Sequence, residues 1–164
     1  MSGSTPSAIK VRYAVLDDAP AILEIYQQHI PFDDINLLSA VHWIEQANSH
    51  RPMWVATIDG ELIGWCSLES YYGLKVLDHV AELSLYIAKS WRRKGIGRQL
   101  MAEVLENALC INLTNLVVNV FSGNESSIRF FESMNFQRYG AIPRIVKMPH
   151  HTEDIIVMGL EITG

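Results

Sequence analysis

The segment Ala81–Met101, AELSLYIAKSWRRKGIGRQLM, constrains the fold of this chain more than any other part of the sequence. Its first half has the apolar composition of a strand, and its second half has the apolar spacing of an amphipathic helix. Only a short turn with two glycines, Gly95 and Gly97, joins them. We therefore expect the helix to begin at this turn and to present its first backbone N–H groups there.

The same turn is strongly basic, although the chain as a whole has a net charge of −5. No acidic residue interrupts positions 83–102. Basic side chains at a helix N-terminus oppose the helix dipole at a cost of roughly 0.3–1 kcal/mol each, which favours a bound anion over a merely solvated helix start. Backbone N–H groups beside the glycines would suit a pyrophosphate. The basic residues of the segment are Lys89, Arg92, Arg93, Lys94 and Arg98.

The glycine spacing excludes two common phosphate-binding motifs. A dinucleotide-binding fingerprint needs a third glycine where this chain has Leu100, and the four-residue spacing of a Walker loop is absent. What remains is R-x-x-G-x-G over 92–97. Nucleic acid is not an expected partner, because the chain lacks the surplus of basic residues that a broad contact needs.

Length and composition indicate one globular α+β domain over residues 9–164, after a flexible segment 1–8. The patterns predict the order β-α-α-β-β-β-α-β-α-β-β around one sheet. Helices are expected after Asp17 and Asp18, at about 39–47, after the basic turn and after Asn124. The predicted strands are 10–15, 53–58, 61–68, 80–87, 116–121, 136–142 and 154–160.

The remaining composition gives mainly negative indications. Cys66 and Cys110 lie in apolar contexts without metal-type spacing, so we expect buried free thiols. No apolar run reaches transmembrane length, and Met1–Ala8 lacks the apolar core of a signal peptide, which favours a cytoplasmic location. The polar group His150, His151, Glu153 and Asp154 is interpreted as a loop between strands, and no metal is expected.

Two segments resemble the acetyl-CoA-dependent N-acetyltransferases of the GNAT superfamily. YIAKSWRRKGIGRQLM, 86–101, is similar to the cofactor signature of that family, and NESSIRFFESMNF, 124–136, to its second cofactor segment. The resemblance extends over almost the whole chain and is greatest to the phosphinothricin and methionine sulfoximine N-acetyltransferase group. It implies the GNAT fold, a single mixed, mostly antiparallel sheet with helices on both faces. It also implies a homodimer, paired through the C-terminal strands and the loop that contains Phe32.

The resemblance assigns cofactor contacts to three places in the chain. Backbone groups of the strand end would meet the acetyl carbonyl and the pantetheine arm, the basic turn would hold the pyrophosphate, and two residues of the second segment would lie near the arm. These residues are Leu85, Tyr86 and Ile87, then Arg92, Arg93, Lys94, Gly95, Ile96, Gly97 and Arg98, and finally Asn124 and Ser127.

Glu82 falls where this group has a glutamate proposed to act as a general base, directly or through water. Strand alternation places Glu82, Ser84 and Tyr86 on one face, and the residues between them on the apolar core face. Only a neutral amine can attack a thioester, and a carboxylate on a mostly apolar strand suits that deprotonation. An ordinary exposed strand glutamate is the alternative. The expected substrate-binding residues are Tyr72, Glu82, Leu83 and Ser84.

Four positions depart from the family pattern. Phe131 stands where many members have a tyrosine that protonates the leaving thiolate. Asn135 replaces a glycine before Phe136, and asparagine tolerates a positive φ. Tyr72 and Leu74 stand where arginines that would bind a substrate carboxylate are expected, so the sequence does not identify the amine.

We therefore predict an N-acetyltransferase that transfers the acetyl group of acetyl-CoA directly to a small, amino-acid-like primary amine. Its partners would be this small molecule and a second copy of the chain, with no nucleic acid and no membrane. Two alternatives stay open. One is acetylation of a peptide or protein N-terminus, and the other is a non-catalytic acyl-CoA-binding sensor.

Overall fold

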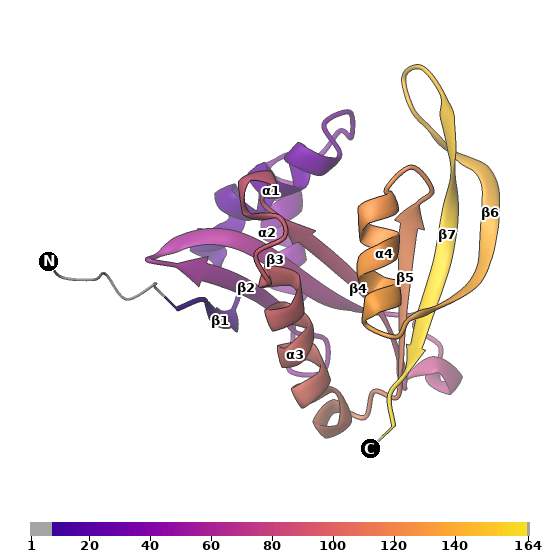
Figure 1. Ribbon diagram of the computed structural model, residues 1–164. Helices are drawn as coiled ribbons and strands as arrows, with labels where there is room; N and C mark the ends of the chain where they lie inside the picture. Colours follow the sequence, from indigo (N-terminus) through magenta and orange to yellow (C-terminus); the bar gives the residue numbers. More distant parts are fainter. Residues whose placement is uncertain (1–7, 164) are drawn as a thin grey trace, which may run out of the picture. The chain divides into compact units, whose positions relative to one another are not determined.

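The computed structural model describes residues 8–163, which contain one seven-stranded sheet and four α-helices (Figure 1). The strand order is β1-β2-β3-β4-β5-β7-β6. β4 and β5 are parallel, whereas β1–β2, β2–β3, β5–β7 and β6–β7 are antiparallel. The predicted order of elements and the mixed sheet are confirmed. The strands are β1 (Lys10–Tyr13), β2 (Met53–Ile58), β3 (Glu61–Ser70), β4 (Val80–Ile87), β5 (Asn115–Phe121), β6 (Gln137–Lys147) and β7 (Thr152–Glu161), and the helices are α1 (Ala19–His29), α2 (Leu37–Gln46), α3 (Ile96–Ala108) and α4 (Glu125–Ser133).

The bounds of β1, β3, β5, β6 and β7 differ from the prediction, and the differences at the ends of β1 and β6 have a clear local cause. β1 ends at Tyr13 because the Asp18 carboxylate accepts the N–H of Val15 at 2.8 Å and pairs with Arg12 at 2.8 Å, which begins a 3₁₀ turn before α1. β6 continues past Pro143, which an edge strand tolerates because its N–H side need not join a ladder. The predicted segment 1–8 lies outside the described residues except for Ala8, and the single domain stays a prediction.

Two compact units can be distinguished, and each is described by itself. Unit 1 comprises the chain up to Ser67 together with Leu85–Glu106, and unit 2 comprises Leu68–Ser84 together with the chain from Asn107 onward. β4 therefore contributes Val80–Ser84 to unit 2 and Leu85–Ile87 to unit 1. None of the helices in residues 8–163 is long and apolar enough to cross a membrane.

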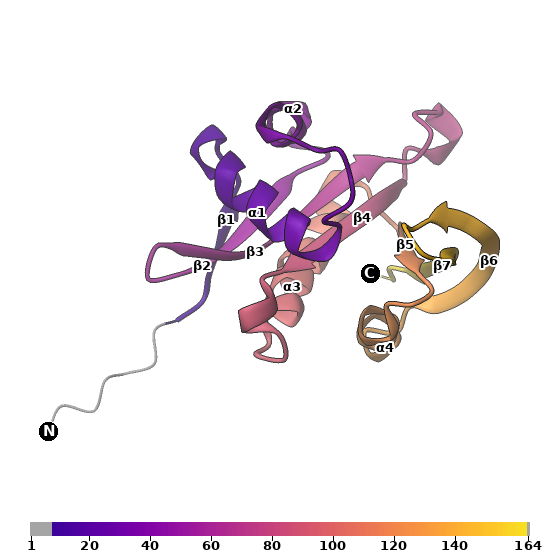
Figure 2. The ribbon, with the colours of Figure 1, turned by 90° about the horizontal axis from the view of Figure 1, so that it is seen from above.

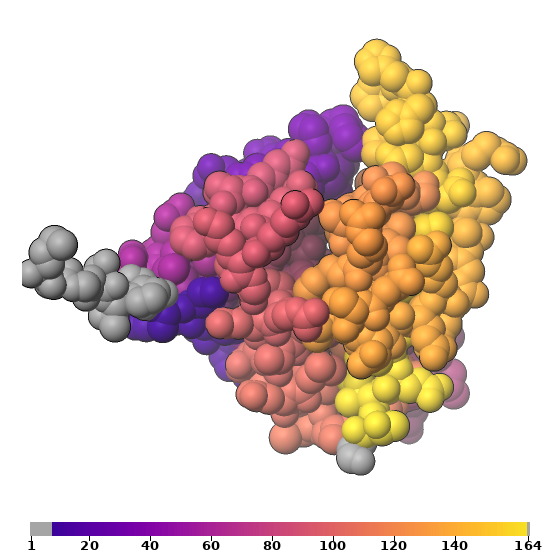
Figure 3. Space-filling model, in the orientation of Figure 1, coloured from indigo at the N-terminus to yellow at the C-terminus, as the bar shows by residue number. Residues whose placement is uncertain are grey.

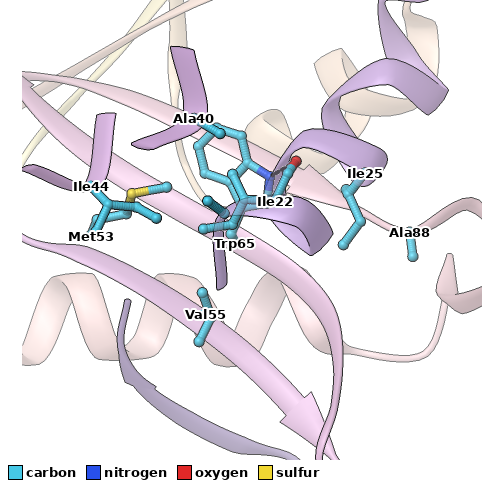
Figure 4. Close-up of a cluster of buried hydrophobic side chains, with 9 residues drawn as sticks. Ile22, Ile25, Ala40, Ile44, Met53, Val55, Trp65 and Ala88 are labelled. Carbon is cyan, nitrogen blue, oxygen red and sulfur yellow. Dashed lines mark hydrogen bonds between the residues drawn. The ribbon is translucent and has the colours of Figure 1, made fainter. Parts of the chain in front are cut away.

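In unit 1, α1 and α2 cover one face of β2 and β3, and α3 covers the other (Figure 2). The indole N–H of Trp65 donates to the carbonyl of Ile22 at 3.2 Å, which satisfies the polar atom of a large buried ring. This arrangement buries the apolar stripe of α1 against the sheet. Figure 4 shows the cluster, with Ile22, Ile25, Ala40, Ile44, Met53, Val55, Trp65 and Ala88 labelled.

α3 packs through the apolar face that its spacing predicts. Ile96, Leu100, Met101, Val104 and Ala108 are each at most 1% exposed. The helix ends at Ala108, however, and a 3₁₀ turn over Leu109–Ile111 follows, closed by a left-handed Asn112. This early end places Leu109 and Cys110 at the surface, so the prediction of a buried Cys110 was wrong.

Unit 2 consists mainly of α4 packed on the long β6–β7 hairpin and β5. Ile128, Phe131 and Phe136 are buried, whereas Met134, which follows the last residue of α4, is only half-buried. Asn135 has φ 71°, the conformation expected for it. The tip of the hairpin stands clear of α4 (Figure 3).

Candidate active site

In the basic turn of unit 1, Gly95 lies in the turn as predicted, whereas Gly97, also expected there, is the second residue of α3. Arg93 and Gly95 both have positive φ, 62° and 82°, and α3 begins immediately afterwards at Ile96. The N–H of Gln99 donates to the carbonyl of Gly95 at 3.1 Å, which is the first hydrogen bond of the helix. The N–H groups of residues 96–98 therefore lie ahead of it, at the positive end of the helix.

The surroundings of this turn suit an anion. A Cβ atom added to Gly95 would meet nothing within 4 Å, so the space above its backbone is open. Arg93 and Lys94 are exposed, and no carboxylate of residues 8–163 forms an ion pair with either. The ammonium of Lys94 lies 5.1 Å from the centre of the Trp91 ring. Arg93 and Lys94 thus place exposed positive charge beside accessible backbone, which fits a pyrophosphate group.

Packing beneath the turn depends on a glycine that sequence reasoning overlooked. A Cβ atom on Gly64 of β3 would lie 2.8 Å from Cδ1 of Ile87 and 3.2 Å from Cγ2 of Ile96. The missing side chain lets the end of β4 and the first turn of α3 pack closely against β3. An isolated glycine inside a predicted strand was the available signal.

The end of β4 is less buried than its alternation suggests. Ala81 and Leu83 are buried, as expected for the core face, but Leu85 and Ile87 are only half-buried. The Tyr86 ring does not face an open site, because it packs 5.0 Å from Trp65 and 5.2 Å from Tyr26 between ring centroids. The Tyr86 ring is therefore occupied by packing, and Leu85 and Ile87 have apolar side chains. The polar groups that Leu85–Ile87 can offer to a ligand are those of the backbone.

The C-terminal end of α1 contacts the end of β4 and the residues that lead into the turn. The sequence analysis did not predict these contacts. Oε1 of Gln28 accepts the N–H of Lys89 at 2.9 Å. Nε2 of His29 lies 2.6 Å from the carbonyl oxygen of Ile87. Two neighbouring helical residues thus fix the backbone on which the basic turn begins.

Unit 2 holds the residues expected to meet the amine. Glu82 is half-buried, and Nδ2 of Asn119 on β5 donates to its Oε1 at 2.9 Å. Partial burial and the negative charge of Glu82 together raise the pKa of Glu69. Leu83 is buried, so its side chain is not available to a substrate, and Ser84 is half-buried. Asn119 and Glu69 were not predicted, although a polar residue inside the apolar strand 116–121 was a usable signal for Asn119.

The loop after β3 exposes the side chain of Tyr72, one of the predicted substrate-binding residues. Tyr72 is 79% exposed with φ 57°, and its ring stands edge-on to Tyr71 at 4.6 Å between centroids. Partial burial, Tyr72 and the charge of Glu82 raise the pKa of Tyr71. The charge of Glu82 therefore acts on Tyr71. Two apolar residues of the same loop, Leu74 and Val76, are exposed at 57% and 77%.

The second family segment, 124–136, contains the whole of α4. Oδ1 of Asn124 accepts the N–H of Ser127 at 3.2 Å, so Asn124 caps the helix. Phe131 is 6% exposed and packs 5.1 Å from Phe136 between ring centroids. It lies in the apolar core and carries no proton to donate.

Two other groups of reactive side chains, Cys66 and the pair His151 and Glu153, have contacts that explain them without a catalytic role. Cys66 is fully buried, and this burial raises the pKa of its thiol, which opposes a role as nucleophile. At the tip of the β6–β7 hairpin, His151 lies 3.0 Å from Glu153, whose other oxygen accepts the N–H of Gly123. Within residues 8–163 no group of three potential metal-ligating side chains is placed to hold an ion.

A basic turn at the N-terminus of a helix, set beside a mixed sheet, agrees with the comparison to known protein families. The chain belongs to the acetyltransferase (GNAT) family, whose model matches residues 17–136. It is therefore an acetyltransferase by family membership.

Two curated relatives are similar over most of their length. YwnH of Bacillus subtilis, named provisionally as a phosphinothricin acetyltransferase, is 28% identical over 161 residues, which cover 93% of this chain and 99% of the relative. The L-methionine sulfoximine/L-methionine sulfone acetyltransferase of Pseudomonas aeruginosa is 27% identical over 144 residues, 82% of this chain and 84% of the relative.

Two solved structures share the fold. YncA from Salmonella typhimurium, solved with its cofactor acetyl-CoA, matches with a TM-score of 0.87 at 22% identity, over 96% of both chains. The ribosomal-protein-alanine N-acetyltransferase of Brucella melitensis matches with a TM-score of 0.85 at 28% identity, over 93% of this chain and 99% of that one. The predicted GNAT fold is confirmed.

Proposed function

We propose that this acetyltransferase transfers the acetyl group of acetyl-CoA to the amino group of a small amino-acid-like compound by direct attack. The observation that carries the proposal is the basic turn, whose exposed cations stand at the N-terminus of α3, in the segment that resembles the family's cofactor signature. The named activities of the two curated relatives support an amino-acid-like acceptor.

The residues of unit 1 would hold acetyl-CoA. Residues 92–98 would neutralise its pyrophosphate with side chains and with the N–H groups of the first turn of α3. Leu85–Ile87 would contact the pantetheine arm and the acetyl carbonyl through backbone groups. Asn124 and Ser127 remain predicted contacts near the arm, and the capping bond of Asn124 leaves its amide N–H₂ as the group for that purpose.

Glu82 would prepare the amine. Its carboxylate takes a proton from the ammonium, and the amine nitrogen then attacks the thioester carbonyl carbon. The C–N bond forms as the C–S bond breaks, the acylated nitrogen loses its remaining excess proton to solvent, and CoA leaves as the thiolate. Phe131 cannot protonate the CoA thiolate. Because a thiol has a pKa of about 8.5, the thiolate is a tolerable leaving group that solvent can protonate afterwards. Asn119 would keep the Glu82 carboxylate in place.

A thiol-release assay over a panel of amines tests this proposal. The panel contains amino acids, their sulfoximine and sulfone analogues, polyamines and peptides with free N-termini, each with acetyl-CoA as donor. We expect amine-dependent release of free CoA with at least one amino-acid-like compound. If none of the amines in the panel led to release of free CoA, the result would instead support the acyl-CoA-binding sensor.

Acetylation of a protein N-terminus is a second candidate, favoured by the similarity to the Brucella melitensis structure. The exposed apolar side chains of the loop, Tyr72, Leu74 and Val76, could contact a peptide. The panel separates the two functions, because a peptide acetyltransferase would prefer an N-terminal tripeptide over the free amino acid of the same first residue.

We also propose that the enzyme is a homodimer. The edge strand β6 carries the exposed side chains Tyr139, Ile142 and Ile145, which supports pairing through the C-terminal strands. Sedimentation velocity tests this, and a monomer at micromolar concentration would contradict it. The cytoplasmic location stays a prediction.

A further inference from the structure

The last turn of α1 is joined to the start of the basic turn through His29, which lies outside the two segments 86–101 and 124–136 that resemble the family's cofactor motifs. His29 reaches the carbonyl oxygen of Ile87 with its Nε2 at 2.6 Å, while Gln28 accepts the N–H of Lys89. On its other side, Nδ1 of His29 lies 3.5 Å from Nη2 of Arg92. The ring thus lies between the end of β4 and the first arginine of the turn.

These contacts define the protonation state of the ring. The Ile87 carbonyl can only accept a hydrogen bond, so Nε2 must carry the proton. The Arg92 guanidinium can only donate, so Nδ1 must offer a lone pair to it. Both requirements are met by one species, the neutral imidazole with its proton on Nε2.

The environment of the ring favours the same neutral species. His29 is half-buried and packs on Tyr86, with 5.8 Å between ring centroids. The charged groups that act on it are Arg92 and Lys89, both positive. The other titratable neighbours are the phenols of Tyr86 and Tyr26, and the hydroxyl of Tyr26 donates to Asp33 at 2.6 Å. Burial lowers the pKa of His29, and the two positive charges lower it further, while the bond to Ile87 opposes them.

We propose that His29 is a positioning residue for the cofactor site, because its neutral imidazole holds the Ile87 carbonyl and the Arg92 guanidinium in one arrangement. The inference rests on the proposed function in one respect, that acetyl-CoA is the ligand of the basic turn. Protonation of His29 would convert Nδ1 from acceptor to donor and add a positive charge facing Arg92. Affinity for acetyl-CoA therefore falls as the pH falls through the titration of His29, and is fully present above it.

The test measures the Kd of acetyl-CoA by calorimetry between pH 5 and pH 8.5 for the wild type and three variants. His29→Leu removes both contacts. His29→Gln keeps a donor and an acceptor but does not titrate. His42→Gln, an exposed histidine on α2, is the matched control. The phosphate groups of the ligand, which titrate near ~6, contribute equally to all four proteins.

We expect His29→Leu to weaken binding about fivefold to tenfold at pH 8, from the loss of one or two hydrogen bonds. His29→Gln should bind within about twofold of the wild type at pH 8 and should lack the additional loss at low pH that wild type and His42→Gln share. The kcat at saturating acetyl-CoA should stay within about twofold for each variant, since the residue acts on cofactor binding.

Three results would overturn the inference. The first is wild-type affinity in His29→Leu, the second is equal pH profiles for wild type and His29→Gln, and the third is ¹⁵N NMR evidence for a proton on Nδ1 at pH 8. If His29→Leu fails to fold, the comparison of wild type with His29→Gln and the NMR measurement still decide. Absence of wild-type binding at every pH would instead refute the proposed function, and the inference with it.

Discussion

The basic turn 92–98 and the loop 71–77 both lie at the surface, but they are held in very different ways. In the turn, Ile96 is 1% exposed and anchors the backbone against Gly64, while α1 fixes the approach to it. In the loop, Tyr72, Leu74 and Val76 are all more than half exposed. The ring of Tyr72 stands edge-on to the ring of Tyr71.

This contrast agrees with the two roles that we propose, cofactor binding by the turn and selection of the amine by the loop. A cofactor shared by every member of a family can be bound by backbone N–H groups, and these need a backbone fixed by packing. An acceptor that differs between members is better met by exposed side chains, which can be exchanged without loss of stability. Substitutions in the turn should therefore change cofactor affinity, and substitutions in the loop should change amine selection.

The largest effect is expected at Glu82. Glu82→Gln removes the base but keeps an acceptor for Asn119, so turnover should fall by about 10²–10⁴-fold while the affinity for acetyl-CoA stays unchanged. Steady-state thiol release measures the effect, with Glu125→Gln on the surface of α4 as the control. Turnover equal to wild type would refute the assignment of Glu82 as base.

The next effect is expected in the turn. The double substitution Arg93→Gln and Arg98→Gln removes two charges that would face the pyrophosphate, and glutamine does not worsen the positive φ at Arg93. The Kd for acetyl-CoA should rise roughly 10- to 100-fold, from the loss of charge-assisted hydrogen bonds. Arg129→Gln, an exposed arginine of α4, is the control. Unchanged affinity in the double variant would show that the turn is not the anion site.

Gly64→Ala tests whether packing holds the turn. The added methyl group would contact Ile87 and Ile96 at less than ordinary distance, so the free energy of unfolding should fall by about 1–3 kcal/mol. Thermal denaturation measures this, and the Kd for acetyl-CoA should rise in parallel. Gly140→Ala is a matched control, since a methyl group there meets nothing within 4 Å. Equal melting temperatures for the two variants would contradict a tightly packed turn.

The smallest effect on stability is expected in the loop. Tyr72→Ala removes an exposed ring and should change the free energy of unfolding by at most about 1 kcal/mol, with no change in acetyl-CoA affinity. Its KM for the amine should rise severalfold if the ring contacts the acceptor. Val76→Ala, in the same loop, should leave both values unchanged. Weakened acetyl-CoA binding in Tyr72→Ala would remove the distinction between loop and turn.

The sequence predicted well those features that follow from local chemistry. The buried face of α3, the two-residue connection between the predicted strands 53–58 and 61–68, and the positive φ of Asn135 all depend on residues close together in the chain. Contacts between distant segments were missed, among them Asn119 on Glu82 and His29 on Ile87. The early end of α3 was missed as well, because the closing residue Asn112 lies beyond the apolar pattern.

The central claim is that the basic turn binds acetyl-CoA whereas Glu82 serves the chemistry. Calorimetric titration of acetyl-CoA into Glu82→Gln and into the Arg93→Gln/Arg98→Gln double variant tests it most directly. We expect Glu82→Gln to bind within about twofold of the wild type and the double variant to bind at least about tenfold more weakly. Wild-type affinity in the double variant, or a loss of affinity in Glu82→Gln as large as in the double variant, would contradict the claim.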